Sequence, residues 1–168
     1  MRVRDATPDD APAIAAIKVA GWRAAYRGLL PDSALAALDV DRLTGEWCSA
    51  LTSLASPGGC LVAELDGAVV GYVVFGAYRW PELPGAGEVY ALYVDPTHWG
   101  GGAGRALMEA AAQRLAAAGL TEQALWVLET NQAGRRFYEA LGWSWDGVTD
   151  ARCELEGAVE ARYRFTAP

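Results

Sequence analysis

The chain has 168 residues, of which 52% are hydrophobic, and a formal net charge of −7. This length and composition predict one folded domain over residues 1–168 with a buried core. The acidic balance argues against nucleic acid as a partner, because a phosphate backbone requires a basic face. No apolar run approaches the roughly 18 residues that cross a membrane, and the first ten residues lack a secretory core. We therefore expect a cytoplasmic protein with no membrane partner.

The sequence lacks the clustered ligands of a metal site or a disulfide framework. Its three cysteines, Cys48, Cys60 and Cys153, are widely spaced, and we expect them to be small core residues. His98 is the single histidine, and no Gly-x-Ser-x-Gly elbow accompanies it, which disfavours a serine hydrolase. His98 is therefore expected on a surface loop.

The first half of the chain predicts helices followed by a hairpin. Residues 2–4 form a short strand, and Thr7 caps a helix that starts at Pro8 and ends at Gly28. Two more helices are expected at residues 32–38 and 41–54. Asp66-Gly67 then reads as a tight turn between antiparallel strands at residues 60–65 and 69–78.

The second half alternates strands and helices. The predicted order is a strand at residues 88–95, a helix at 105–118, a strand at 124–129, a helix capped by Asn131 and ending at Gly142, and a pair of strands within 143–165 that turn at Gly157. Helices, then a meander, then strand–helix alternation predict an α/β (α+β) layered sheet.

Residues 88–105, EVYALYVDPTHWGGGAGR, place a strand, a glycine-rich loop and a helix N-terminus in succession. This arrangement presents free backbone N–H groups to an anion. The GxGxxG dinucleotide fingerprint fails, because Arg105 or Leu107 occupies its last position, and no lysine follows as in a phosphate-loop NTPase. What remains is a loop that could approach a diphosphate closely, or a turn that holds no ligand.

A family resemblance favours the diphosphate. The run EVYALYVDPTHWGGGAGRALM, followed by ALWVLETNQAGRRFYEALGW, resembles the GCN5-related N-acetyltransferase (GNAT) superfamily. Its signature, (Gln/Arg)-x-x-Gly-x-(Gly/Ala), aligns with residues 99–104, where Trp99 replaces the leading Gln/Arg. Its later Asn and aromatic-Tyr pair match Asn131 and Phe137-Tyr138. Seven helical residues turn through about 700°, so Asn131 and Tyr138 are expected on one side of their helix.

The resemblance implies a three-layer fold. Its mixed, mostly antiparallel sheet of about six to seven strands has helices on both faces and is splayed at the fourth and fifth strands. It also implies acetyl-CoA as cosubstrate and no metal. The implied cofactor contacts are the backbone of Leu92, Tyr93 and Val94 along pantetheine, the loop residues Gly100, Gly101, Gly102, Ala103, Gly104 and Arg105 around the pyrophosphate, and Asn131.

Two residues are candidates for proton transfer. Tyr138, whose ordinary pKa of about 10 keeps it protonated at neutral pH, is implied as the acid that protonates the departing thiolate; packing beside Phe137 is the alternative. Glu88 is the candidate base, expected on one strand face with Tyr90, Leu92 and Val94. Burial would have to raise its ordinary pKa of about 4.3. A solvated glutamate, with ordered water as the base, is the alternative.

The acceptor is the least specified part. The first helices and the loop before the central strand point to Trp22, Tyr26, Tyr78, Trp80 and, as a cation anchor, Glu82. We expect an acyl-CoA-dependent N-acyltransferase that acetylates a primary amine of a small molecule in a ternary complex. A protein acetyltransferase acting on lysine or an N-terminus, and a non-catalytic acyl-CoA-binding module, are the alternatives. Monomer and homodimer both stay open.

Overall fold

The computed structural model describes residues 1–28, 32–53, 56–151 and 158–167. Its strands form one seven-stranded sheet in the order β1-β2-β3-β4-β5-β7-β6. Within the described residues, neighbouring strands are antiparallel except for β4 and β5, which are parallel. The mixed, mostly antiparallel sheet is therefore confirmed. The strands are β1 (Arg2–Asp5), β2 (Gly59–Leu65), β3 (Ala68–Ala77), β4 (Gly87–Val94), β5 (Glu122–Leu128), β6 (Ser144–Asp150) and β7 (Glu160–Thr166).

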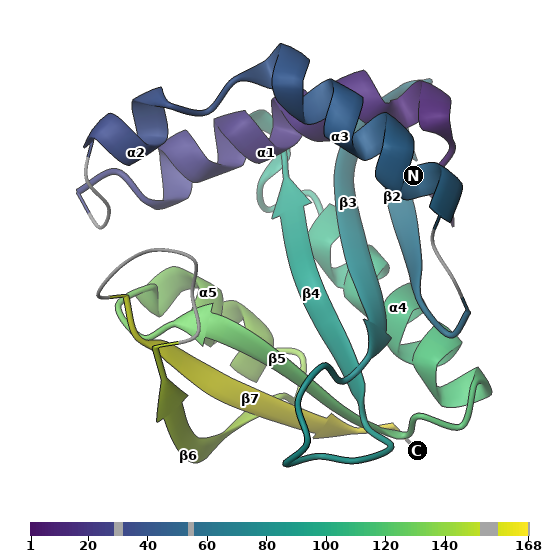
Figure 1. Cartoon of the computed structure of the whole chain (residues 1–168), viewed down its shortest axis with the longest axis vertical. Coiled ribbons are helices and arrows are strands. Elements are labelled where there is room, and N and C mark those ends of the chain that lie inside the picture. Colours follow the sequence, from purple (N-terminus) through teal and green to yellow (C-terminus); the bar gives the residue numbers. More distant parts are fainter. Residues whose placement is uncertain (29–31, 54–55, 152–157, 168) are drawn as a thin grey trace.

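Helices cover both faces of this sheet, giving the predicted three layers. In Figure 1, α1 and α3 lie together on one side of β3 and β4, and α4 lies on the other. The helices are α1 (Ala11–Ala25), α2 (Asp32–Ala36), α3 (Val40–Ser53), α4 (Ala103–Ala117) and α5 (Gln132–Glu139), with 3-10 turns η1 (Pro8–Asp10) and η2 (Pro96–His98). None of the described helices is both long and apolar enough to cross a bilayer.

Strand alternation divides the core between the two faces. Val73 and Phe75 of β3 pack with Leu107 and Leu115 of α4 in the larger cluster. Tyr72, which precedes Val73 and points to the opposite face, packs with a second cluster that includes Ile14 and Ile17 of α1. Each fully buried side chain of this kind stabilises the fold by about 1.5–3 kcal/mol.

The N-terminal turn is held by a buried carboxylate. Asp10 accepts hydrogen bonds from Nη1 and Nη2 of Arg4 at 2.7 and 2.9 Å, and from the Thr7 backbone N–H at 2.8 Å. Thr7 is the N-cap, as predicted. The helix expected from Pro8 to Gly28 is instead a 3-10 turn followed by α1, which ends at Ala25. The Arg4 hydrogen bonds, aided by Thr7, lower the pKa of Asp10.

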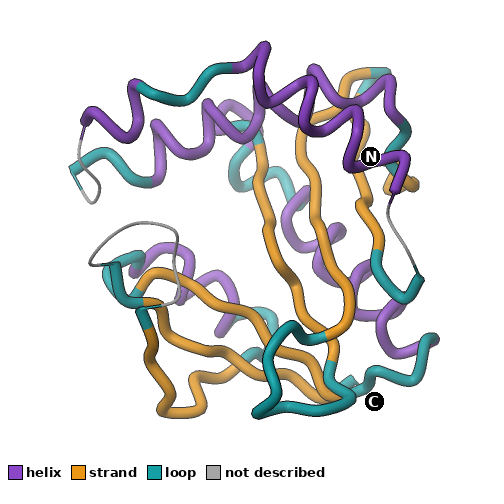
Figure 2. The backbone as a smooth tube through the Cα atoms, in the orientation of Figure 1, coloured by secondary structure: helices purple, strands orange, loops and turns teal. Residues whose placement is uncertain are grey.

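The predicted splay lies between β4 and β5. The two strands pair only at Gly87–Gln123, Glu88–Ala124 and Val89–Leu125. Beyond Val89 they diverge, β4 toward α1 and β5 toward the α5 side, as the strands in Figures 1 and 2 show. The rest of β4 therefore has a backbone edge that β5 does not cover.

Two sequence predictions concern the cysteines and the last turn. Cys60 is buried, as expected, but Cys48 is exposed. The prediction of a core position for Cys48 is wrong, because its thiol donates to the Pro8 carbonyl, 3.7 Å away, at an exposed position of α3. Cys153 and the turn at Gly157 lie outside the described residues.

Candidate active site

The glycine-rich loop forms the N-terminus of α4. Gly100 and Gly102 have φ values of +78° and +87°, a region that residues with a Cβ rarely adopt. Gly102 is the helix N-cap. The first helical hydrogen bond runs from the Ala106 N–H to the Gly102 carbonyl. The amides of Ala103, Gly104 and Arg105 therefore point out of the helix end, where its dipole favours an anion. The Gly101 amide is already used, since it donates to the His98 carbonyl at 3.2 Å.

Trp99, the residue that departs from the family signature, has a structural contact of its own. Its indole N–H donates to the Val94 carbonyl at 2.8 Å, while the residue as a whole is 54% exposed. This hydrogen bond ties the loop to the end of β4. His98, expected on a surface loop, lies in the short 3-10 turn η2. Its Nδ1 is 3.0 Å from the Thr97 hydroxyl.

Helix α5 packs against the loop. Asn131 is its N-cap, and its Oδ1 accepts from the Gly134 N–H at 2.9 Å. The Phe137 ring lies so close to α4 that a Cβ on Gly104 would be 3.1 Å from Cζ. The glycine at position 104 therefore permits the contact that fixes α5, and with it Tyr138, beside the loop.

These parts border one cavity of about 500 Å³ in the β4–β5 splay. It runs from the α4–α5 side of the sheet to the α1 side. Of the predicted cofactor contacts, Leu92, Tyr93, Val94, Gly100, Gly102, Ala103, Gly104, Arg105 and Asn131 line it, and so do Tyr138 and Tyr26. Gly101, whose amide is used internally, is not among the lining residues.

Tyr138 lines the part of the cavity in which the β4–β5 splay connects the two faces of the sheet. Its ring is 5.3 Å from Phe137 and 6.4 Å from Tyr163, measured between centroids. Burial, with a smaller contribution from Tyr26 across the splay, raises the pKa of its phenol well above the ordinary tyrosine range. The group therefore stays protonated over the whole neutral range.

Glu88 lies beside the cavity and is fully buried. Its Oε1 accepts from Nη2 of Arg79 at 2.6 Å, and its Oε2 accepts from the Arg79 Nε and backbone N–H, both at 3.1 Å. Glu88 is not one of the residues that line the cavity. Its role as base stays a prediction.

The expectation that Glu88 and Tyr90 share a face with Leu92 and Val94 is wrong. Val74 of β3 pairs with Ala91 but Phe75 pairs with Val89, so β4 carries Tyr90 as an extra residue. This bulge breaks the alternation. Leu92 and Val94 pack toward α4, whereas Glu88 lies opposite Gly76 on the other face.

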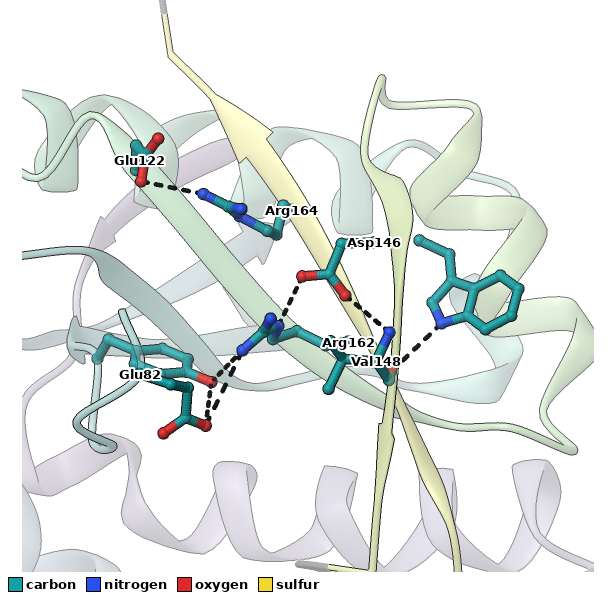
Figure 3. Close-up of polar contacts among 8 residues, drawn as sticks. Glu82, Glu122, Asp146, Val148, Arg162 and Arg164 are labelled. Carbon is teal, nitrogen blue, oxygen red and sulfur yellow. Dashed lines mark hydrogen bonds and ion pairs between the residues drawn. The ribbon is translucent and has the colours of Figure 1, made fainter. Parts of the chain in front are cut away.

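The predicted acceptor residues are separated by the fold. Tyr26 lines the cavity, and Trp22 stands behind it, donating its indole N–H to the Tyr93 hydroxyl at 2.7 Å. Tyr78 and Glu82 lie outside the lining residues and join a polar cluster around Arg162, shown in Figure 3. Trp80 is 38% exposed and is also not in the lining.

The residues that sequence reasoning missed at this site include Arg79, Tyr90, Trp126 and Glu160, whose side chains are charged or aromatic. The last three line the cavity, and Arg79 lies over the Tyr90 ring with 4.6 Å between its Cζ and the ring centroid. Strand alternation could have placed Glu160 and Trp126 on one sheet face. It could not have paired β7 with β5, because that pairing brings together segments more than 30 residues apart.

The chain resembles known acetyltransferases in sequence. The model of the acetyltransferase (GNAT) family matches residues 22–143. Over 156 residues the chain is 32% identical to the uncharacterized N-acetyltransferase YuaI of Bacillus subtilis, an alignment that covers 92% of this chain and 86% of that protein.

Solved structures show the same fold. The PaiA N-acetyltransferase from Thermoplasma acidophilum in complex with coenzyme A has a TM-score of 0.76 at 17% identity, with 98% of each chain covered. A ribosomal-protein-alanine N-acetyltransferase from Brucella melitensis has a TM-score of 0.75 at 21% identity, with 99% of each chain covered. From the family match and the relative over nearly its whole length, the chain belongs to the GNAT family and is a GNAT-type N-acetyltransferase.

Proposed function

We propose that this enzyme transfers the acetyl group of acetyl-CoA to a primary amine of a small molecule, by direct attack within a ternary complex. The observation that carries the proposal is the cavity in the β4–β5 splay, on which the α4 N-terminus, the uncovered edge of β4 and Tyr138 converge. Positioning both reactants in one cavity makes their reaction effectively unimolecular, which can lower the barrier by about 7–11 kcal/mol.

The residues present fit acetyl-CoA. The outward amides of Ala103, Gly104 and Arg105 suit a pyrophosphate, and the open space around Gly100 and Gly102 lets it approach the backbone. The edge of β4 at Leu92–Val94, which β5 leaves uncovered, suits the amide groups of a pantetheine arm. Acetyl-CoA supplies the activated acyl group, and this chain supplies its orientation.

Tyr138 is the proposed general acid. Its phenol borders the cavity between the loop and the α1 side, and its raised pKa keeps the proton available for a thiolate. Backbone N–H groups of the uncovered β4 edge are the proposed donors to the oxyanion of the tetrahedral intermediate.

The shape of the acceptor side supports a small amine over a protein. Leu35 of α2 packs against Leu128 at the end of β5, so the α1–α2 layer and the splayed strands meet there. The formal charge of −7 favours encounter with a cationic amine. A lysine or N-terminal amine of a protein is the second candidate.

The test is a panel of acceptors assayed by release of free CoA thiol. We expect turnover with small primary amines and less than about a tenth of that kcat/KM with peptides. Tyr138→Phe should lower kcat by about 100-fold, as loss of a general acid does, with the acetyl-CoA Kd kept within about twofold. Peptides turned over faster than every small amine would replace the small-molecule assignment by the protein one. An unchanged kcat in Tyr138→Phe would remove its role as acid.

A further inference from the structure

Glu160 brings a carboxylate to the acceptor side of the cavity. It is the first residue of β7 and pairs with Leu128, the last residue of β5. Its neighbour Ala161 is buried in the core that faces α4, so Glu160 points to the opposite face, toward α1. It lines the cavity there together with Tyr26 and Tyr90.

Arg79 and Arg162, the arginines nearest to Glu160 among the described residues, are already paired with other carboxylates. Arg79 forms its bidentate pair with Glu88. Arg162, two residues along β7 from Glu160, donates its Nε to Asp146 at 2.7 Å, a contact visible in Figure 3. Within the described residues, neither a hydrogen bond nor an ion pair engages the Glu160 carboxylate. The cavity therefore has a carboxylate whose charge is left to a ligand.

We propose that Glu160 binds the ammonium group of the acceptor and takes its proton before attack. This inference rests on the proposed function and assigns the base for it. Glu88, with both oxygens occupied by Arg79 and with no access to the cavity, is then a positioning residue: it holds the Arg79 guanidinium so that Arg79 does not neutralise Glu160.

The step balances in a simple way. The ammonium N–H proton passes to the Glu160 carboxylate, which leaves a neutral amine with a free lone pair. The nitrogen forms a bond to the acetyl carbon, the carbon–sulfur bond breaks, and Tyr138 donates its proton to the thiolate. A second N–H proton leaves the new amide nitrogen, and the two side chains return to their starting protonation through solvent. One acetylamide, one free thiol and one proton are the products.

The charges around Glu160 suit this role. Burial raises the pKa of its carboxyl, Glu88 raises it further by like charge, and Arg79 opposes the rise. The other ionisable groups that border the cavity from neighbouring elements are the phenols of Tyr26, Tyr90, Tyr93 and Tyr138, the imidazole of His98 and, at the distant loop, the guanidinium of Arg105. A phenol carries no charge at neutral pH. A base with a raised pKa is better matched to an amine proton than an ordinary glutamate.

Glu160→Gln is the direct test, because it removes the charge and keeps the shape. We expect kcat to fall by about 100-fold or more, the KM for the amine to rise several-fold and the acetyl-CoA Kd to stay within about twofold. In the wild type, kcat should fall as the pH falls through the pKa of Glu160, since the base must be deprotonated, and this acid limb should be absent in Glu160→Gln. Glu122→Gln is the matched control: Glu122 lies at the far end of the same sheet face, pairs with Arg164 at 3.0 Å and should behave as wild type.

Glu88→Gln separates the two carboxylates. It removes a like charge and frees Arg79 for Glu160, and both effects lower the pKa of Glu160, so the acid limb should remain and move to lower pH. If the acid limb of the kcat profile were lost in Glu88→Gln while Glu160→Gln kept full activity, Glu88 would be the base. That result would overturn this inference and leave the proposed function standing. A wild type that acetylates no amine in the panel would overturn the proposed function, and this inference with it.

Discussion

The Phe137 ring of α5 lies directly against Gly104 in the first turn of α4, where an added Cβ would be 3.1 Å from its Cζ atom. Two helices that belong to different strand–helix units thereby share one contact. Their spacing fixes how far the Tyr138 hydroxyl stands from the end of the glycine-rich loop.

Gly104→Ala should disturb this spacing. Phe137 would have to move by a few tenths of an ångström and carry α5 with it, so we expect kcat to fall by about tenfold with little change in the free energy of unfolding. Gly45→Ala is the control, because Gly45 lies inside α3 with nothing within 4 Å of its added Cβ. It should stabilise the fold by about 0.5–1 kcal/mol and leave kcat unchanged. Equal kcat in both variants would mean that the contact does not position Tyr138.

Gly102→Ala should weaken acetyl-CoA binding. Its φ of +87° costs an alanine about 1–2 kcal/mol, and relief of that strain would turn the loop amides away from the pyrophosphate. We expect the Kd for acetyl-CoA, measured by calorimetry, to rise about tenfold. Gly67→Ala carries the same backbone strain, with φ of +82°, at the β2–β3 turn. It should lose similar stability without changing the Kd; an equal rise in both Kd values would point to general destabilisation.

The pH dependence of kcat should reflect the raised pKa of Tyr138. A general acid must be protonated, and burial holds this pKa above the ordinary tyrosine value of about 10. We therefore expect no decline of kcat from Tyr138 as the pH rises to about 10, in an assay saturated with both substrates. A descending limb near pH 8 or 9 that disappears in Tyr138→Phe would contradict the burial of the phenol.

The Arg4–Asp10 pair should make the free energy of unfolding depend on pH in the acidic range. The folded-state pKa of Asp10 is lowered, so its stabilisation is complete above the unfolded pKa of about 3.9 and is lost as the pH falls through the folded value. Asp10→Asn should cost about 1–3 kcal/mol in urea unfolding at pH 7, and less at pH 2 to 3. Asp9→Asn, which changes an exposed neighbour, should cost under about 0.5 kcal/mol. A cost for Asp10→Asn that is the same at both pH values would show that its charge is not the stabilising feature.

The motifs with local signatures were predictable from the sequence. The glycine-rich loop, the Asn131 cap and the Thr7 cap depend on residues within a few positions of each other, and each lies where its pattern indicates. The family resemblance supplied the splay and the three layers. No pattern within a short window could have supplied either.

The surroundings of the carboxylates were not predictable. Tyr90 is an extra residue in β4, so the side chains before and after it no longer follow one alternation. Simple alternation therefore placed Glu88 on the same face as Leu92 and Val94, which is wrong. Glu160 reaches the cavity because β7 inserts between β5 and β6, a strand order that follows from the whole sheet and not from the sequence around position 160. Pairs formed across the fold, such as Arg79 with Glu88, decide which carboxylate is left for a substrate.

Trp99 gives the enzyme an internal optical probe. The residue is more than half exposed, borders the cavity beside the outward amides of α4, and is held in place by its hydrogen bond to the Val94 carbonyl. A rigid ring in water has an emission that shifts when a neighbouring ligand displaces that water. The chain has seven tryptophans, and Trp126 also lines the cavity, so the part of the emission change on acetyl-CoA binding that is lost in Trp99→Phe would report arrival of the ligand at the loop without any label, and before any chemistry takes place.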